Sequence, residues 1–343
     1  MSYLSTQLIR WHKQFGRKDL PWQIDTNPYK VWISEVMLQQ TQVQTVIPYF
    51  LKFIKRYPDI DSLANSNENE VLSYWSGLGY YSRGRNLLKT AKIIQEEFDS
   101  SMPSCSEKLE SFPGIGKSTA GAILSLGFKM KAPILDGNAK RVLVRYFKVE
   151  DPIDLNKTTK QLWNIAEENL PNKECNVYTQ AIMDVGSLIC KRRNPDCIEC
   201  PLKKKCISFN EKIQNLLPNK SPKKEKPIRQ LYWLLLQNKH GEVLLENRNS
   251  KGVWEGLWTF IGFEEPLSRE NFQDRLPKGY ELLEEGLKLR HTFTHYKLDI
   301  DTTSIKINKD FQDLDNNKVW FNTEELAGIG LPSPVSKILK TFI

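Results

Sequence analysis

Two acidic residues occupy positions in the sequence that suit acid–base chemistry on a glycosidic bond. Glu35 lies within the apolar run 31–38, and burial among such neighbours would raise the pKa of its carboxyl group. Asp136 follows Ile134 and Leu135 and precedes a predicted helix over 139–147, whose dipole would keep its carboxylate ionised. Glycoside hydrolysis needs this combination of one proton donor and one anion. Simpler interpretations are a surface glutamate on an amphipathic helix and an aspartate that only caps a helix.

Four of the six cysteines are clustered with the spacing C-x6-C-x2-C-x5-C: Cys190, Cys197, Cys200 and Cys206. No secretory signal precedes them, so reduced thiols that bind metal are expected rather than disulfides. Four thiolates with no nearby histidine fit either tetrahedral zinc or a 4Fe–4S cluster, and the spacing leaves both open. Basic triplets at 191–193 and 203–205 flank these cysteines, which predicts loops that dock against phosphate.

A Pro-Gly-Ile-Gly turn at 113–116 separates two predicted helical segments. Gly114 and Gly116 allow the backbone to approach a ligand closely. The N-terminus of the following helix presents free N–H groups that suit a phosphate. Such a turn is a weak signal by itself, but the distal cysteine cluster makes a DNA-binding hairpin the favoured interpretation.

The elements that position these residues fall into two predicted domains. Residues 1–210 show apolar residues at helical spacing between short Pro/Gly breaks, which predicts an all-α domain. Residues 211–228 are rich in Pro and Lys and are expected to form a linker. Residues 229–343 show strand patterns, one of them a long stretch over 290–307, and end in a helical pattern, so a mixed α/β domain is expected.

The charge distribution indicates a polyanionic partner for the first domain. The net charge is +8 and the pI is about 9.0. The excess of Lys and Arg lies in residues 1–228, whereas acidic residues slightly outnumber basic ones beyond them. No run approaches the ~18 apolar residues of a membrane span. We therefore expect a cytoplasmic, nucleoid-associated monomer.

Taken in order, these motifs resemble the MutY-type adenine DNA glycosylases of the helix-hairpin-helix (endonuclease III) superfamily. The most specific part is Ser-Glu-Val-Met-Leu-Gln-Gln-Thr-Gln at 34–42, and Pro-Trp-Gln at 21–23 and Gly-Leu-Gly-Tyr-Tyr at 77–81 agree with it. The resemblance implies a 4Fe–4S cluster on the four cysteines and a Nudix-like C-terminal domain. It also implies base excision repair, in which adenine opposite 8-oxoguanine or guanine in double-stranded DNA is flipped out and removed.

The resemblance implies a role for each matched residue. Glu35 would protonate adenine at N7, Asp136 would stabilise an oxocarbenium-like sugar, and Asn138 would orient the site. The residues expected to surround the flipped base are Trp22, Gln23, Leu38 and Gln180, and those expected to wedge into the duplex are Gln40 and Tyr80. Tyr80 has an alternative interpretation as a core residue in a Gly-rich turn.

Ser118 bears on whether the DNA strand is also cut. In the related endonuclease III, a lysine at the equivalent hairpin position forms the Schiff base that leads to strand cleavage. Here that position is Ser118, and Lys117 lies one residue earlier, about 100° away around a helix. We therefore expect a monofunctional glycosylase in which Lys117 faces DNA.

The second domain resembles Nudix hydrolases without their complete R-E-x-x-E-E motif, since the fragments at 269–270 and 283–286 do not assemble it. The resemblance therefore implies lesion recognition rather than hydrolysis. Phe293, Thr294 and His295 match a Phe-Ser-His loop that senses 8-oxoguanine, with Thr replacing Ser. Without the resemblance, His295 would be interpreted as an exposed strand residue.

Two other functions fit parts of the sequence. A thymine-mismatch or oxidised-pyrimidine glycosylase would need a hairpin lysine or a different pocket, and would not need residues 229–343. A non-catalytic iron–sulfur DNA-binding protein would not need both Glu35 and Asp136.

Overall fold

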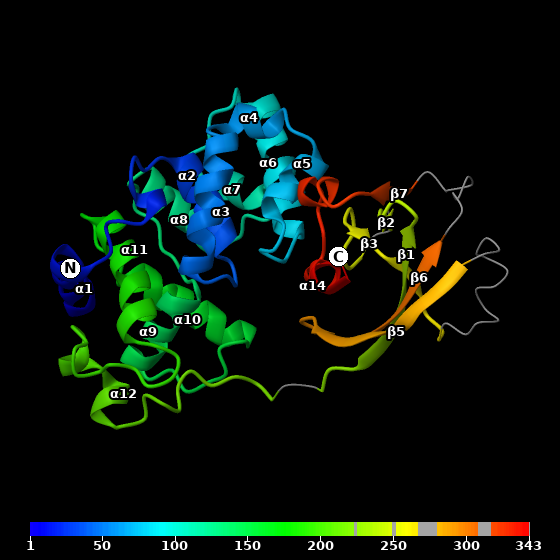
Figure 1. Cartoon of the computed structure of the whole chain (residues 1–343). Coiled ribbons are helices and arrows are strands. Elements are labelled where there is room, and N and C mark those ends of the chain that lie inside the picture. The colour runs from blue at the N-terminus through cyan, green and yellow to red at the C-terminus, as the bar shows by residue number, and fades with distance from the viewer. Residues whose placement is uncertain (223–224, 249–251, 267–279, 308–316, 343) are drawn as a thin grey trace. The chain divides into compact units, whose positions relative to one another are not determined.

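The computed structural model describes residues 1–222, 225–248, 252–266, 280–307 and 317–342 (Figure 1). Two compact units make up the chain: Met1–Asn65 with Asn86–Lys223, and Ser66–Arg85 with Lys224–Ile343. We call them the helical unit and the sheet unit. The domain bounds expected from the sequence (1–210, 211–228 and 229–343) stay a prediction.

Helices account for the regular structure of the first part of the chain. In order they are α1 (Tyr3–Phe15), η1 (Pro21–Gln23), α2 (Pro28–Leu38), α3 (Val43–Arg56), α4 (Ile60–Ala64), α5 (Glu68–Trp75), α6 (Ser82–Phe98), α7 (Ser106–Ser111), α8 (Lys117–Ala122), η2 (Ile123–Gly127), α9 (Gly137–Phe147), α10 (Asn156–Glu168), α11 (Cys175–Asp184), η3 (Val185–Ile189), η4 (Lys203–Lys205) and α12 (Ile207–Asn210).

Local sequence signals explain where the helices nearest the site begin and end. The Asn27 side chain accepts a hydrogen bond from the Lys30 N–H, and Pro28 follows it, so α2 starts there. The Asp136 carboxylate caps α9 in the same way, and α9 ends at Lys148 in the left-handed conformation. The apolar faces of α1, α9 and α11 form one core, in which Leu8 and Ile182 are almost fully buried.

Two helices change from α to π geometry close to one another. Helix α8 continues as the π-helix η2, and α11 continues as the π-helix η3. The Ser125 and Thr179 hydroxyl groups lie 2.7 Å apart in the core and link η2 to α11. Short π segments are frequent at functional sites because they change the direction of the side chains that follow. Here η3 ends directly before Cys190.

A mixed sheet is the main element of the sheet unit, which also contains α5. Its strands are β1 (Ile228–Asn238), β2 (Val243–Asn247), β3 (Trp258–Thr259), β4 (Ile261–Phe263), β5 (Tyr280–Thr292), β6 (Lys297–Ile307) and β7 (Lys318–Phe321). The spatial order is β3-β2-β1-β6-β5, while β4 pairs with β1 and β7 pairs with β2. Strands β1 and β6 are parallel, and the other pairs are antiparallel.

The stretch 290–307, expected as one long strand pattern, is divided between two strands. The Phe293 N–H donates to the Tyr296 carbonyl oxygen at 2.9 Å, so the chain turns back between β5 and β6. The final helix, α14 (Ser333–Phe342), agrees with the predicted closing helix, and its Val335 and Ile338 are buried with Trp233 of β1. Among the described residues, no helix is both long and apolar enough to cross a membrane.

We predict that Leu8→Ala lowers the free energy of unfolding of the helical unit by about 2 to 5 kcal/mol, because a fully buried side chain leaves a cavity. Leu51→Ala is the matched control, since Leu51 is 54% exposed and the same truncation should cost less than ~0.5 kcal/mol. Urea denaturation followed by circular dichroism measures both. Equal losses in the two variants would contradict the core assignment.

Candidate active site

A cavity of about 850 Å³ in the helical unit brings together most of the residues expected at the site. We call it the front cavity. The expected residues that line it are Trp22, Glu35, Leu38, Gln40, Ser118, Asp136, Asn138 and Gln180. Gln23 lines instead a neighbouring cavity of about 410 Å³, the rear cavity, and its side-chain oxygen accepts a hydrogen bond from the Leu20 N–H at 3.2 Å. Residues more than 150 positions apart in sequence therefore share one space.

Glu35 is placed to act as an acid. It lies in the middle of α2 between the buried residues Ser34 and Val36, and it lines both cavities. Burial raises the pKa of Glu35 to about 8, and the negative charge of Asp136 adds to the rise. The carboxyl group is therefore mostly protonated at neutral pH.

Asp136 caps helix α9 and also lines the front cavity. One carboxylate oxygen accepts the Ala139 N–H at 2.7 Å as the cap of α9, and the other accepts the Asn138 side-chain N–H at 3.0 Å. Burial raises the pKa of Asp136, and these hydrogen bonds oppose that rise. The N–H donors favour the ionised form of Asp136, and burial favours the neutral form of Glu35. The site can therefore hold one acid and one carboxylate.

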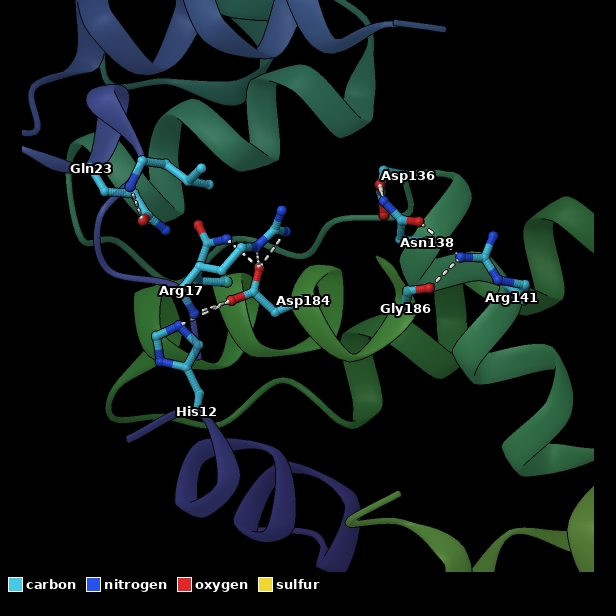
Figure 2. Close-up of polar contacts among 10 residues, drawn as sticks. His12, Arg17, Gln23, Asp136, Asn138, Arg141, Asp184 and Gly186 are labelled. Atoms are coloured by element: carbon cyan, nitrogen blue, oxygen red, sulfur yellow. Dashed lines mark hydrogen bonds and ion pairs between the residues drawn. The ribbon is translucent and has the colours of Figure 1, made fainter. Parts of the chain in front are cut away.

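A chain of hydrogen bonds leads from Asp136 through Asn138 and Arg141 to Gly186 (Figure 2). Arg141 extends it to the cysteine loop, residues 190–206. Asn138 donates to Asp136 and accepts from the Arg141 guanidinium at 2.9 Å. Arg141 also donates to the carbonyl oxygens of Gly186 and, at 2.6 Å, Cys190. Helix α9 therefore fixes the position of the Asp136 carboxylate relative to the first cysteine of the cluster.

The four cysteines line a single small, apolar cavity next to α9. Arg145 is 2% exposed there and donates to the Cys190 sulfur at 3.3 Å and to the Lys191 carbonyl oxygen at 2.7 Å. Within the described ranges, no three His, Cys, Asp or Glu side chains are arranged to hold a single metal ion. The fold nevertheless gathers the four thiols around one space, with a cation beside them.

Sequence reasoning missed a buried ion pair behind the site. Asp184 is fully buried, and its carboxylate accepts the backbone N–H of Arg17 at 2.9 Å and the Arg17 guanidinium at 2.6 Å (Figure 2). Gln180, one turn earlier on α11, donates to the same carboxylate at 3.0 Å. The signal was an aspartate inside an apolar helical run, which implies a buried partner. Asp184 therefore holds both Arg17 and Gln180, which line the front cavity.

The hairpin residues take different directions. Gly114 has φ +81°, a conformation that favours glycine. A Cβ at this position would also stand 2.9 Å from the Asn86 Cβ, so there is no room for a side chain. Lys117 pairs with Glu167 at 3.1 Å and lies 4.3 Å from the Trp163 ring centroid. The Ser118 hydroxyl oxygen accepts the Leu135 N–H at 3.2 Å and borders the front cavity. Lys117 is thus directed toward α10, while Ser118 reaches the site.

The remaining expected residues lie in the sheet unit. Tyr80 has φ +50° and is 47% exposed, so it is not a core residue. Phe293 stacks against Trp254 and Tyr296 at the turn between β5 and β6. Thr294 and His295 are exposed at the tip, with their Oγ1 and Nδ1 atoms 3.3 Å apart. An apolar anchor therefore presents two polar side chains to solvent.

Comparison with known proteins identifies the family. Residues 33–168 match the HhH-GPD superfamily of base excision DNA repair proteins, and residues 232–341 match the NUDIX domain. An adenine DNA glycosylase of Buchnera aphidicola is 44% identical over 97% of this chain and 94% of its own length. The chain belongs to the adenine DNA glycosylase family. It is a DNA N-glycosylase, and the resemblance drawn from the sequence is confirmed.

Other relatives support the same assignment. The human adenine DNA glycosylase is 38% identical over 58% of this chain and 38% of that protein. A thermostable thymine-DNA glycosylase of known structure is 26% identical, with a TM-score of 0.55 over 60% of this chain and 95% of its own. The expected fold class is confirmed as well: a helix-hairpin-helix glycosylase domain is followed by a Nudix-like domain.

We predict that Gly186→Ala lowers the rate of base excision about tenfold or more, since small displacements of catalytic groups are costly. A Cβ at Gly186 would stand 2.6 Å from the Asn138 Cβ and 2.9 Å from its carbonyl oxygen, so Asn138 or η3 must shift, which disturbs the hydrogen bond from Asn138 to Asp136. Single-turnover kinetics measure the rate, and circular dichroism checks the fold. Gly328→Ala is the control, because a Cβ there meets nothing within 4 Å. A fully active Gly186→Ala would show that this packing does not position Asn138.

Proposed function

We propose that this glycosylase removes adenine opposite 8-oxoguanine or guanine in double-stranded DNA, without cutting the strand. The observation that carries the proposal is the front cavity, where a carboxyl group that favours its neutral form and a carboxylate stabilised by N–H donors line one space. This is the arrangement of acid and anion that cleavage of an N-glycosidic bond requires.

In the proposed reaction, the flipped adenine enters the front cavity and receives the Glu35 proton at N7. The bond between C1′ and N9 then breaks, its electron pair stays with the base, and positive charge develops on the sugar. The Asp136 carboxylate, held by Asn138 and Ala139, stabilises that charge. Water adds its hydroxyl group to C1′ and returns a proton to Glu35, so that the products are adenine and an abasic site.

Residues around the two carboxyl groups would hold the base and the opened duplex. Trp22 is buried and packs edge-on against Phe50, with ring centroids 5.4 Å apart, so it offers a fixed wall to a flipped base. Gln180 is held by Asp184, and its side-chain amide can hydrogen-bond to the edge of the base. The exposed Gln40 and Tyr80 both have positive φ and are proposed to fill the gap left in the duplex.

The absence of strand cleavage is proposed from the direction of Lys117. Strand cleavage through a Schiff base needs an amine that reaches C1′ of the flipped nucleotide. Lys117 is engaged with Glu167 and Trp163, and the residue at the cavity is Ser118. A hydroxyl group cannot form a Schiff base, so the reaction should stop at the abasic site.

We propose a 4Fe–4S cluster on Cys190, Cys197, Cys200 and Cys206. All four thiols line one cavity, and the N–H donor of Arg145 suits a negatively charged cluster. When bound, such a cluster would serve as a structural cross-link for the loops between the cysteines. The exposed basic residues on these loops would then bind DNA phosphates, among them Lys191, Arg192, Arg193, Lys203, Lys204 and Lys205.

The sheet unit is proposed to recognise 8-oxoguanine through Phe293, Thr294 and His295. The exposed hydroxyl and imidazole groups at the β5–β6 turn can hydrogen-bond to a base edge. We do not expect nucleotide hydrolysis, since the sequence lacks the complete Nudix motif. The fragment at 269–270 lies outside the described residues, as do the side chains at 283–285 of the fragment at 283–286.

Single-turnover assays with four duplexes test the proposal. They carry adenine opposite 8-oxoguanine, adenine opposite guanine, thymine opposite guanine, and thymine glycol. We expect free adenine from the first two only, and intact strands until alkali is added. Excision of thymine alone would favour a thymine-mismatch glycosylase, and binding without any excision would favour a non-catalytic DNA-binding protein.

We predict that Glu35→Gln abolishes adenine release while mismatched DNA still binds, since an amide cannot donate the catalytic proton. The loss should be at least ~100-fold, in the range for removal of a general acid. Glu96→Gln is the control, because Glu96 is exposed on α6. Fluorescence anisotropy measures binding, and full activity in Glu35→Gln would remove Glu35 from the mechanism.

The dependence of the single-turnover rate on pH follows from the two carboxyl groups. Glu35 acts in its protonated form, so the rate should fall as the pH rises through about 8. Asp136 acts in its ionised form, and its raised pKa should place the acidic limb above the ordinary range of an aspartate. A rate that stays constant across the alkaline limb would contradict the role of Glu35 as the proton donor.

A further inference from the structure

The rear cavity adjoins the front cavity at the proposed acid. Its volume of about 410 Å³ far exceeds that of one nucleobase. Four residues line both cavities: Arg17, Trp22, Glu35 and Gln180. They come from three separate segments, namely the stretch containing η1, helix α2 and helix α11. Gln23, which the resemblance places beside the flipped base, lines the rear cavity. The proposed mechanism assigns no function to the other residues that line only this cavity, among them Leu126, Asn176 and Val177.

The lining of the rear cavity suits an uncharged heteroaromatic base. Leu126 and Val177 offer apolar contacts, while Gln23 and Asn176 carry amides that both donate and accept hydrogen bonds. Apolar walls with a few amide groups are typical of small-molecule sites. Lys18, Thr26 and Lys129 also line the cavity and are exposed, so it extends to the protein surface.

The front cavity reaches the surface among different residues. Exposed Lys191 and Arg192 line it together with Arg141, so its mouth is cationic and suits the DNA backbone. After excision, the abasic nucleotide is still part of the DNA and occupies that mouth. The free base is then enclosed between the DNA and the residues shared by the two cavities.

We propose that the rear cavity is the exit site for the free base, which leaves through it while the abasic DNA is still bound. This inference rests on the proposed function. Asp184 holds Arg17 (Figure 2) and Gln180, and Trp22 packs on Phe50, so these three shared side chains stay in place and the base passes beside Glu35.

Val177→Trp tests this proposal, because Val177 lines the rear cavity but not the front one, and the indole would fill much of the space. The substrate is duplex DNA with radiolabelled adenine opposite 8-oxoguanine and a fluorophore at one end. Chemical quenching measures excision, rapid filtration of unquenched samples measures free adenine, and anisotropy measures DNA dissociation. Lys173→Trp is the control, since Lys173 is exposed and lines neither cavity.

For the parent protein we expect free adenine to appear before the DNA dissociates. In Val177→Trp, the rate of excision should stay within about twofold of the parent rate. The release of adenine from the unquenched complex should slow about tenfold or more. Lys173→Trp should match the parent in both measurements. Adenine that appears only as the DNA dissociates from the parent would overturn the exit site, whatever the variant does.

The outcomes separate this proposal from the one on which it rests. No excised adenine in quenched samples of the parent would mean that the proposed function has failed. Excision at the normal rate, with release unchanged by a folded Val177→Trp, would mean that only the exit site has failed. If Val177→Trp does not fold, Leu126→Trp replaces it in the same measurements, because Leu126 also lines the rear cavity and not the front one.

Discussion

The carboxylate of Asp136 is the point on which the rest of the site depends. It caps α9 through the Ala139 N–H and is held by Asn138, so one group both starts a helix and faces the front cavity. A carboxylate in a buried site is costly unless N–H donors satisfy it. The helix terminus supplies those donors without any added charge, which lets the neighbouring Glu35 remain the neutral member of the pair.

Helix α9 extends this constraint to the cysteine loop. Arg141 and Arg145 lie one turn apart, and their guanidinium groups reach the Cys190 carbonyl oxygen and the Cys190 sulfur, respectively. The π-helix η3 places Cys190 and Gly186 where these arginines can meet them. A disturbance of the cysteine loop would therefore be transmitted to Asn138 and Asp136 through direct hydrogen bonds.

The buried pair of Arg17 and Asp184 plays the corresponding part on the other side of the cavity. It joins residues 167 positions apart (Figure 2), and Asp184 also accepts a hydrogen bond from Gln180. Breaking a buried ion pair by removing one partner is strongly destabilising, because the other charge is left without compensation. The walls of the cavity are thus held by polar contacts that come from distant parts of the chain.

The sequence by itself determined the features that depend on neighbouring residues. Helical periodicity predicted the all-α part, the position of Asp136 before 139–147 predicted a helix cap, and the cysteine spacing predicted a shared site. Tertiary structure decided the direction of Lys117, the partners of Asp184 and the pKa of Glu35. Each of these depends on groups far away in sequence, or on burial, and no local pattern encodes which distant surface will cover a residue.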